Sequence, residues 1–445
     1  MNILEILSKI LKNANSYFLD LIVIALLLFS GVYFTISLKF VQVRHFKEGF
    51  KKAFLNRGTG NSSFSALATA VAAQIGTGNI VGAAGAILIG GAGSVFWMWI
   101  VAFFGMATAY AEASLAQQFA TVKNGEKIGG PIYYILALFK GNIGKTLSKI
   151  FAVSTILSLS FSGTMIQSNA TALAAYNSYK IHPSIIGALL AILCLCVYLS
   201  GAEKIMKITG KLVPIMTVVF VFACLVVIIA RANRIFDVFV LIISSAFRPK
   251  ALAGGFIGAT FKTCISEGVK KGLFSNEAGM GSTPHAHASA KDVTPHEQGT
   301  VAMMGVFIDT FVILTLTSFV MLSYMIDNSD VAEINQNNLM LLSLQGVLGK
   351  ASSNILLNIS LFLFAFTSVI SWNYFGRINF EFLYDRKHIV LYFTLSAAFT
   401  FIGSIISDKL VWNISEFTLF FMILPNALAL FKGRKCLKQA LYRAK

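Results

Sequence analysis

The chain has 445 residues, of which 56% are hydrophobic and only 12% are charged, and its mean hydropathy is +0.74. Soluble proteins carry about 25% charged residues, so this composition excludes an ordinary soluble domain and indicates a membrane protein. The net charge of +17 does not indicate nucleic-acid binding, because Lys and Arg fall in short clusters between apolar runs, as membrane orientation requires. The five cysteines form no CxxC pair and fit small apolar helix positions.

Apolar segments of about 20 residues, the length that crosses the hydrocarbon of a bilayer, recur along nearly the whole chain. The first of them is not followed by a small-residue cleavage site, so we predict a retained helix rather than a signal peptide. The predicted crossings are residues 17–38, 63–88, 94–119, 150–174, 184–200, 212–230, a broken segment within 255–290, 300–326, 353–376, 388–406 and 410–431.

The distribution of positive charge predicts the orientation. Most Lys and Arg residues fall on alternate connections and on the basic tail 432–445, which places the N-terminus outside and the C-terminus in the cytoplasm. The inner connection 120–149 contains an amphipathic stretch, Ile132–Leu138, and is predicted to form an interfacial helix. The connections 233–250 and 327–352 are predicted to lie along the outer surface and to cap it.

A polar, glycine-rich interruption lies within the second predicted crossing. Gln74, Thr77 and Asn79 cluster around two glycines in an otherwise apolar run. Close helix packing explains the many small residues there, but it does not require three polar side chains. A broken helix survives in a bilayer only where it is buried or lines a cavity. Unwinding at this point would direct backbone N–H groups at an anion. It would also leave backbone carbonyls available to bind a cation or an ammonium group.

A second interruption occupies the corresponding place in the second half of the chain. Ser275, Asn276 and Glu277 are followed by two more glycines, and a lipid-facing helix would not accommodate this sequence. A cytoplasmic loop is the alternative, because two histidines and Lys291 follow closely. A matched pair of broken helices points to the substrate site of a secondary transporter.

Other kinds of site are not supported by the sequence. His285 and His287 are spaced i,i+2 and do not share a helical face, so they do not form a helical metal-binding pair. The stretch 76–79 lacks the Lys-Ser/Thr of a phosphate-binding loop. We find no nucleophile–base pattern typical of a membrane hydrolase. The sequence therefore predicts a transporter and not an enzyme.

The residues of the two breaks resemble those of a known family. The sequence Gly-Leu-Phe-Ser-Asn-Glu-Ala-Gly-Met-Gly-Ser at 272–282 closely resembles the signature of the alanine/glycine:cation symporter family. The stretch 76–82, Gly130-Pro131 and Gln167-x-Asn169 are also similar to that family, and the resemblance covers essentially the whole chain. It implies an all-α polytopic membrane protein with about 11 transmembrane helices and a LeuT-like fold, in which one additional helix precedes a five-plus-five inverted repeat.

The resemblance also implies how the chain is divided. Residues 1–445 would form a single transporter domain, with a broken helix at the start of each repeat. The implied segments are the additional helix 17–38, the first repeat 63–230, the second repeat 255–431 and the basic cytoplasmic tail 432–445.

By the same resemblance, a small neutral amino acid such as alanine or glycine would bind between the two breaks. Trp372 would close the pocket and limit the size of the side chain, although its position near Arg377 also fits an interfacial anchor. Thr164 stands where the family pattern has asparagine, which affects the expected polarity of the pocket. The implied substrate-binding residues are Thr77, Gly78, Asn79, Gln167, Ser275, Asn276, Gly279, Met280 and Trp372.

LeuT-fold relatives that use sodium place the ion between the unwound first repeat helix and the helix before the final pair. The corresponding groups here are the carbonyls of Ala72 and Ile75 and the hydroxyls of Thr367 and Ser368, which are oxygen ligands suited to a hard cation. The two hydroxyls fit equally well as structural groups that bond to their own or a neighbouring helix.

A proton is the alternative coupling ion, carried by Glu277, Glu112 or Asp309, although the last two also fit structural roles. We therefore predict a Na⁺- or H⁺-coupled importer of alanine and glycine that works by alternating access. Its expected location is the cytoplasmic (inner) membrane of a bacterium or archaeon, with no other cofactor, no nucleic acid and no obligate protein partner. A symporter for another small solute and an uncoupled channel are the alternatives.

Overall fold

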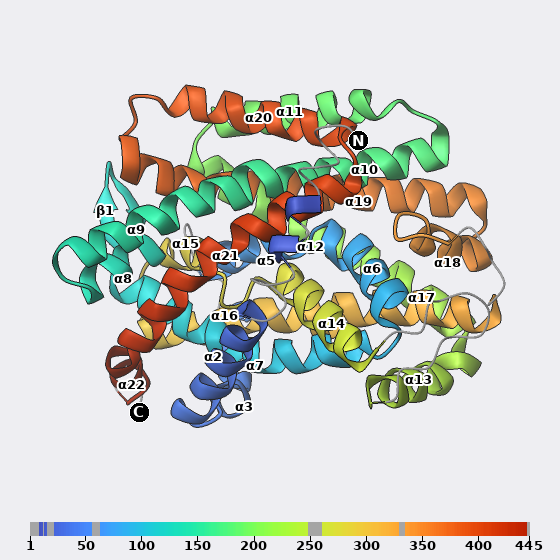
Figure 1. Ribbon diagram of the computed structural model, residues 1–445, viewed down its shortest axis with the longest axis horizontal. Helices are drawn as coiled ribbons and strands as arrows, with labels where there is room; N and C mark the ends of the chain where they lie inside the picture. Colours follow the sequence, from blue (N-terminus) through green and yellow to red (C-terminus); the bar gives the residue numbers. More distant parts are fainter. Residues whose placement is uncertain are drawn as a thin grey trace.

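The helices of the computed structural model run side by side, roughly along the longest axis of the molecule (Figure 1). The strands among the described residues are β1 (Thr121–Lys123) and β2 (Glu126–Ile128), which form an antiparallel hairpin. Parts of the first and seventh predicted crossings and the end of the tail (17–21, 255–259 and 443–445) lie outside the described residues. The structure describes residues 9–11, 13–15, 22–55, 63–247, 260–328 and 334–442.

A helix, or a run of consecutive helical segments, lies at each of the predicted crossings. By length and composition, six described helices can span a membrane, and the bent pair α5–α6 is a further candidate. The count of eleven crossings therefore stays a prediction. The segments are α2 (Ile24–Ser37), α5 (Ser63–Gln74) with α6 (Val81–Gly90), α7 (Ser94–Gln118), α9 (Gly141–Thr155) with α10 (Thr164–Tyr179), α11 (Pro183–Tyr198), α12 (Ala202–Ala230), α14 (Phe261–Asn276) with α15 (Pro284–Ala288), α16 (Pro295–Val306) with α17 (Thr315–Asp327), α19 (Lys350–Tyr384), α20 (Ile389–Ile405) and α21 (Asp408–Lys432).

Short elements connect or interrupt these helices. The π-helical segment η3 joins α9 to α10, and η5 joins α16 to α17; such wide turns are rare and often lie at functional sites. The predicted amphipathic helix is present as α8, but it packs on α9 and α21, so protein covers much of its apolar side. The additional elements are α3 (Val41–Arg44), α4 (Phe46–Phe54), η2 (Thr77–Asn79), α8 (Pro131–Leu138), η3 (Ile156–Gly163), η4 (Ala232–Arg234), α13 (Ile235–Phe247), η5 (Phe307–Leu314), α18 (Leu339–Leu348) and α22 (Arg434–Tyr442).

Local sequence signals fix the start of α16. The side chain of Thr294 accepts a hydrogen bond from the backbone N–H of Glu297 (3.2 Å), and the Glu297 carboxylate accepts one from the N–H of Thr294 (2.9 Å). This reciprocal capping box satisfies two N–H groups that the first turn of a helix leaves unpaired. Pro295 occupies the first helical position, where its missing N–H costs nothing.

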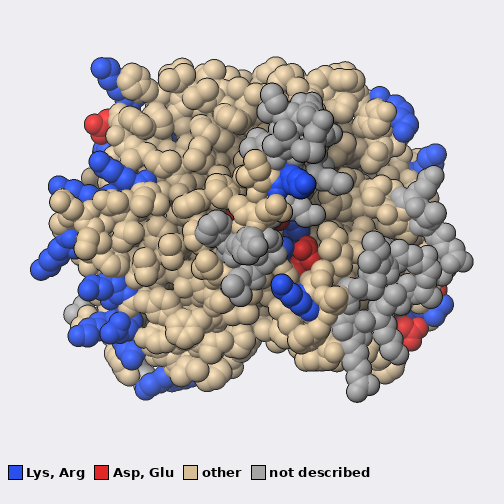
Figure 2. All heavy atoms as spheres, viewed as in Figure 1, with Lys and Arg blue, Asp and Glu red and all other residues tan. Residues whose placement is uncertain are grey.

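The helices form two groups that meet at the broken helices. One group contains α7 with α14 and α16, which both pack on α7, in the lower part of Figure 1; the other contains α10, α11, α19 and α20 in its upper part. The helix α14 packs on α6, and α15 packs on α5, so the two broken helices lie alongside each other in opposite directions. Lys and Arg side chains gather at the end that carries β1, α8 and α22, as Figure 2 shows.

Candidate functional site

The first break is a bend of 56° between α5 and α6, with the short 3₁₀ turn η2 in between. The side-chain oxygen of Asn79 accepts the N–H of Gly76 (3.1 Å) and so closes the turn from within. A Cβ atom at Gly76 would lie 2.5 Å from Nε2 of Gln167 and 2.9 Å from Oγ of Ser368. The glycine therefore allows side chains of α10 and α19 to reach the opened backbone.

Gln167 supplies a hydrogen-bond partner to the opened backbone, because its Oε1 accepts the N–H of Thr77 (2.9 Å). The amide of Gln74 links the two breaks by donating to the carbonyl of Asn276 (2.7 Å). The Thr77 hydroxyl and Oε1 of Gln74 are buried, and within the described part of the chain neither has a hydrogen-bond partner. Buried polar atoms usually have a partner, so these two oxygens are candidates to receive a ligand.

Asp309, in η5, is the centre of a hydrogen-bond network between the breaks. Its carboxylate accepts bonds from the amide of Asn79 (2.6 Å) and from the hydroxyl of Thr310 (2.9 Å). The Ser275 hydroxyl lies 3.0 Å from each of its oxygens. The amide of Asn276 in turn donates to Thr310 (3.2 Å). The structure thus brings predicted site residues of both breaks together around one buried carboxylate.

The second break is buried throughout residues 272–282, which is not the environment of an exposed cytoplasmic loop. Glu277 ends α14 in the left-handed conformation (φ +58°). Its carboxylate accepts hydrogen bonds from Ser282 and from the indole N–H of Trp372 (2.5 Å). Gly279 and Gly281 also have positive φ angles (+88° and +82°), a conformation that favours glycine.

Glu112, on α7, holds the glycine-rich part of this break. Its carboxylate accepts the backbone N–H groups of Gly279 (3.1 Å) and Gly281 (2.8 Å). The amide of Asn426 donates both to Glu112 (2.6 Å) and to the carbonyl of Gly279 (2.9 Å). The predicted site residues Gly279 and Met280 therefore belong to a second network; Met280 is buried and its N–H donates to the carbonyl of Glu277 (3.1 Å).

Trp372 lies deep in the protein, with 2% of its surface exposed. Its ring meets Phe274 edge-on, with 6.2 Å between the centroids. A Cβ atom at Gly163 would lie 2.9 Å from the indole, and one at Gly78 would lie 3.4 Å from the ring of Phe274. This burial fits a pocket wall better than an interfacial anchor. Thr164, the residue at which the chain departs from the family pattern, donates its hydroxyl to the backbone of its own helix.

Only one of the two predicted ion-binding hydroxyls points at the first break. The Ser368 hydroxyl donates to the carbonyl of Ala72 (2.9 Å) and lies 3.4 Å from that of Ile75, so three oxygens converge where α5 ends. The adjacent Thr367 hydroxyl donates to the carbonyl of Leu363 (3.0 Å), one turn back in its own helix. The structure thus brings Ser368, Ala72 and Ile75 together and turns Thr367 away.

Three buried carboxyl groups lie around the breaks without a basic partner. Glu112, Glu277 and Asp309 are each fully buried, and among the described residues none of them forms an ion pair with Lys or Arg. Sequence reasoning named them as proton carriers but missed the bond from Trp372 to Glu277 and the network around Asp309. A single acid within an apolar run was the available signal, and it does not reveal the partners.

Comparisons with known proteins identify the family of the chain. A model of the sodium:alanine symporter family matches residues 4–443. The sodium/alanine symporter AgcS of Methanococcus maripaludis is 38% identical over 430 residues, which cover 95% of this chain and 94% of that protein. The amino-acid carrier protein AlsT of Bacillus subtilis is 33% identical over 407 residues, which cover 90% and 84% of the two chains.

A solved structure shows the same fold at low sequence identity. The crystal structure of MhsT in complex with L-phenylalanine superposes with a TM-score of 0.62 and 15% identity, covering 87% of this chain and 98% of that chain. The likeness confirms the predicted LeuT-like architecture. The chain therefore belongs to the sodium:alanine symporter family, and it is a multi-pass membrane transporter that carries an amino acid together with a cation.

Proposed function

We propose that this protein imports alanine and glycine in symport with Na⁺, and that the substrate binds between the two broken helices. The proposal is carried by one observation: the Ser368 hydroxyl meets the carbonyls of Ala72 and Ile75 at the end of α5. Hydroxyl and carbonyl oxygens are the ligands that hard cations prefer. The family match and the name of the archaeal sodium/alanine symporter support the choice of ion and of alanine.

In this proposal the amino acid lies against the opened backbone of both breaks. Thr77, Gly78 and Asn79 contribute from the first break, with Gln167 beside them. Ser275 and Asn276 contribute from the second. The unpartnered hydroxyl of Thr77 supports a polar contact with the substrate. Trp372 limits the size of the substrate, because an indole packed on Gly163 and Phe274 has little room to move aside.

Coupling follows from the shared position of the two ligands. A cation held at the end of α5 would fix the backbone of the first break in the conformation that the substrate needs. By linkage, the substrate would then raise the affinity for the cation by the same factor. Alternating access would proceed by movement of one helix group against the other around the site.

The orientation proposed for the cytoplasmic membrane is N-terminus outside and C-terminus inside. It is supported by the Lys and Arg side chains that gather at the end carrying the C-terminal helix (Figure 2).

Reconstituted protein tests the proposal. Liposomes would be loaded with buffer, and labelled alanine would be supplied with an inward Na⁺ gradient, an inward H⁺ gradient or neither. We expect accumulation above equilibrium only with the Na⁺ gradient, and competition by unlabelled glycine. Accumulation driven only by the H⁺ gradient would assign the coupling to a proton carried by one of the buried carboxyls. Flux that merely equilibrates would indicate a channel and refute symport.

A further inference from the structure

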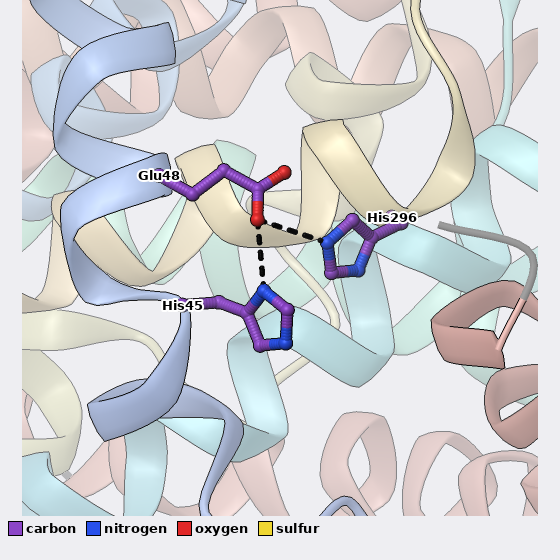
Figure 3. Close-up of side chains that lie close together, drawn as sticks. All are labelled: His45, Glu48 and His296. Atoms are coloured by element: carbon purple, nitrogen blue, oxygen red, sulfur yellow. Dashed lines mark hydrogen bonds and ion pairs between the residues drawn. The ribbon is translucent and has the colours of Figure 1, made fainter. Parts of the chain in front are cut away.

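Two histidines and a glutamate meet outside the transport site, where α4 lies against the start of α16 (Figure 3). Nδ1 of His45 lies 2.8 Å from Oε2 of Glu48, and Nε2 of His296 lies 3.3 Å from the same oxygen. The three ligand atoms all lie within 4.8 Å of one another. The side chains come from two parts of the chain that are about 250 residues apart, so this arrangement is a product of the fold.

The backbone under this cluster is held firmly in place. A Cβ atom at Gly49 would lie 2.5 Å from the carbonyl of Thr300, so the glycine lets α4 pack directly on α16. The rings of Phe46 and Phe307 meet edge-on, with 4.9 Å between their centroids. Lys52 forms an ion pair with Glu297. These contacts fix the two helices that carry the cluster, which reduces the ordering that a ligand would have to impose.

His296 has a feature typical of metal-binding histidines. Its other ring nitrogen, Nδ1, is hydrogen-bonded to the hydroxyl of Tyr110 (2.7 Å), which fixes the orientation of the ring. Histidine ligands almost always have such a partner on the nitrogen that does not bind the metal. The hydrogen bond leaves Nε2 of His296 facing Glu48 and His45.

The cluster is also accessible from solvent. The side chains of Glu48 and His45 are 37% and 22% exposed. His296 itself is 3% exposed, and it lines a hollow of about 280 Å³ beside α22.

We propose that His45, Glu48 and His296 bind one Zn²⁺ ion, which fastens α4 to the start of α16. Zinc binds to histidine nitrogen at about 2.0–2.1 Å, so two ligands of a tetrahedral site are about 3.3 Å apart. The distances of 2.8 Å and 3.3 Å to Glu48 are close to that separation, but the three ligand atoms spread over up to 4.8 Å, so binding of zinc would draw the two ring nitrogens closer together. Two imidazoles and a carboxylate form a ligand set that zinc uses in proteins, with water in the fourth position. The site is separate from the proposed Na⁺ site and from the substrate.

The test is a zinc titration of the full-length protein in detergent, after removal of any polyhistidine tag and treatment with a chelator. Calorimetry should show one Zn²⁺ bound per chain, and zinc should raise the melting temperature, because a ligand that binds only the folded state stabilises it. His45→Ala and Glu48→Gln, which alter half-exposed side chains, should each abolish this binding. Gel filtration confirms that the variants are folded.

Two further variants separate this site from general histidine binding. Tyr110→Phe removes only the hydroxyl that orients His296, and should weaken zinc binding by about 10- to 100-fold. His182→Ala removes an exposed histidine that bonds to Ser184 at the start of α11, and should leave binding unchanged. The proposal is refuted if wild-type protein binds no zinc, or if the same binding persists in His45→Ala and Glu48→Gln.

Discussion

Replacing Ser368 by alanine should weaken the binding of the coupling cation without disturbing the helix that carries the residue. The hydroxyl lies 2.9 Å from the carbonyl of Ala72 and 3.4 Å from that of Ile75, and it is the only side-chain oxygen that the described residues place on these two carbonyls. A polar contact with a charged group contributes about 1.5–3 kcal/mol. Since about 1.4 kcal/mol corresponds to a factor of ten, the apparent affinity for Na⁺ should fall by roughly 10- to 150-fold.

The neighbouring residue provides a matched control. Thr367→Ala removes a hydroxyl from the same turn of α19, but this hydroxyl bonds to the carbonyls of Leu363 (3.0 Å) and Phe364 (3.2 Å) in its own helix. The half-saturating Na⁺ concentration for alanine uptake into liposomes should therefore rise in Ser368→Ala and stay within about twofold in Thr367→Ala. The Thr367 hydroxyl is buried, but it bonds within its own helix and not to the carbonyls of Ala72 and Ile75.

Reciprocity adds a second measurement. At a low, fixed Na⁺ concentration, the Ser368→Ala variant should also bind alanine more weakly, and saturating Na⁺ should restore its affinity for alanine. The reasoning is wrong if Thr367→Ala shifts the Na⁺ dependence as much as Ser368→Ala, or if Ser368→Ala leaves it unchanged.

Four further variants probe the rest of the site. Asn79→Ala and Gln167→Ala each remove a side chain that closes the first break, so alanine uptake should be abolished while gel filtration still shows a folded protein; normal uptake would exclude the assigned pocket. Trp372→Ala opens the wall of the pocket and should admit larger amino acids in competition assays, whereas unchanged selectivity would give the indole a purely structural role. Glu112→Gln replaces a carboxylate that accepts two backbone N–H groups, so it should destabilise the protein by about 2–3 kcal/mol; an unchanged melting temperature would contradict this.

The sequence was sufficient to predict where the two helices break, because glycines and residues with amide side chains interrupt apolar runs at matching places. It could not decide between Thr367 and Ser368, since adjacent helical residues point about 100° apart and the rotation of the helix depends on tertiary packing. The His45–Glu48–His296 cluster escaped notice for a related reason. His45 and Glu48 are one helical turn apart, but the third member is fixed only by the packing of α4 on α16.

The hairpin of β1 and β2 was missed although its turn has a clear signal. Asn124-Gly125 is the commonest type of two-residue hairpin turn, and both residues have positive φ angles (+53° and +77°). The segment was interpreted only as part of a long polar connection between membrane helices. In a chain dominated by apolar runs, a short strand pair contributes too little to the overall pattern to be noticed.

A cation that binds among three buried carboxyl groups, which have no Lys or Arg partner within the described part of the chain, has an electrical consequence. A neutral zwitterion adds no net charge, so the charge of the site changes by one whenever a monovalent cation enters or leaves. Moving one elementary charge across a membrane potential of 100 mV corresponds to about 2.3 kcal/mol of work. In the proposed symport each cycle moves the charge of the cation inward, so an inside-negative membrane drives net import even when the concentrations of cation and amino acid are equal on both sides.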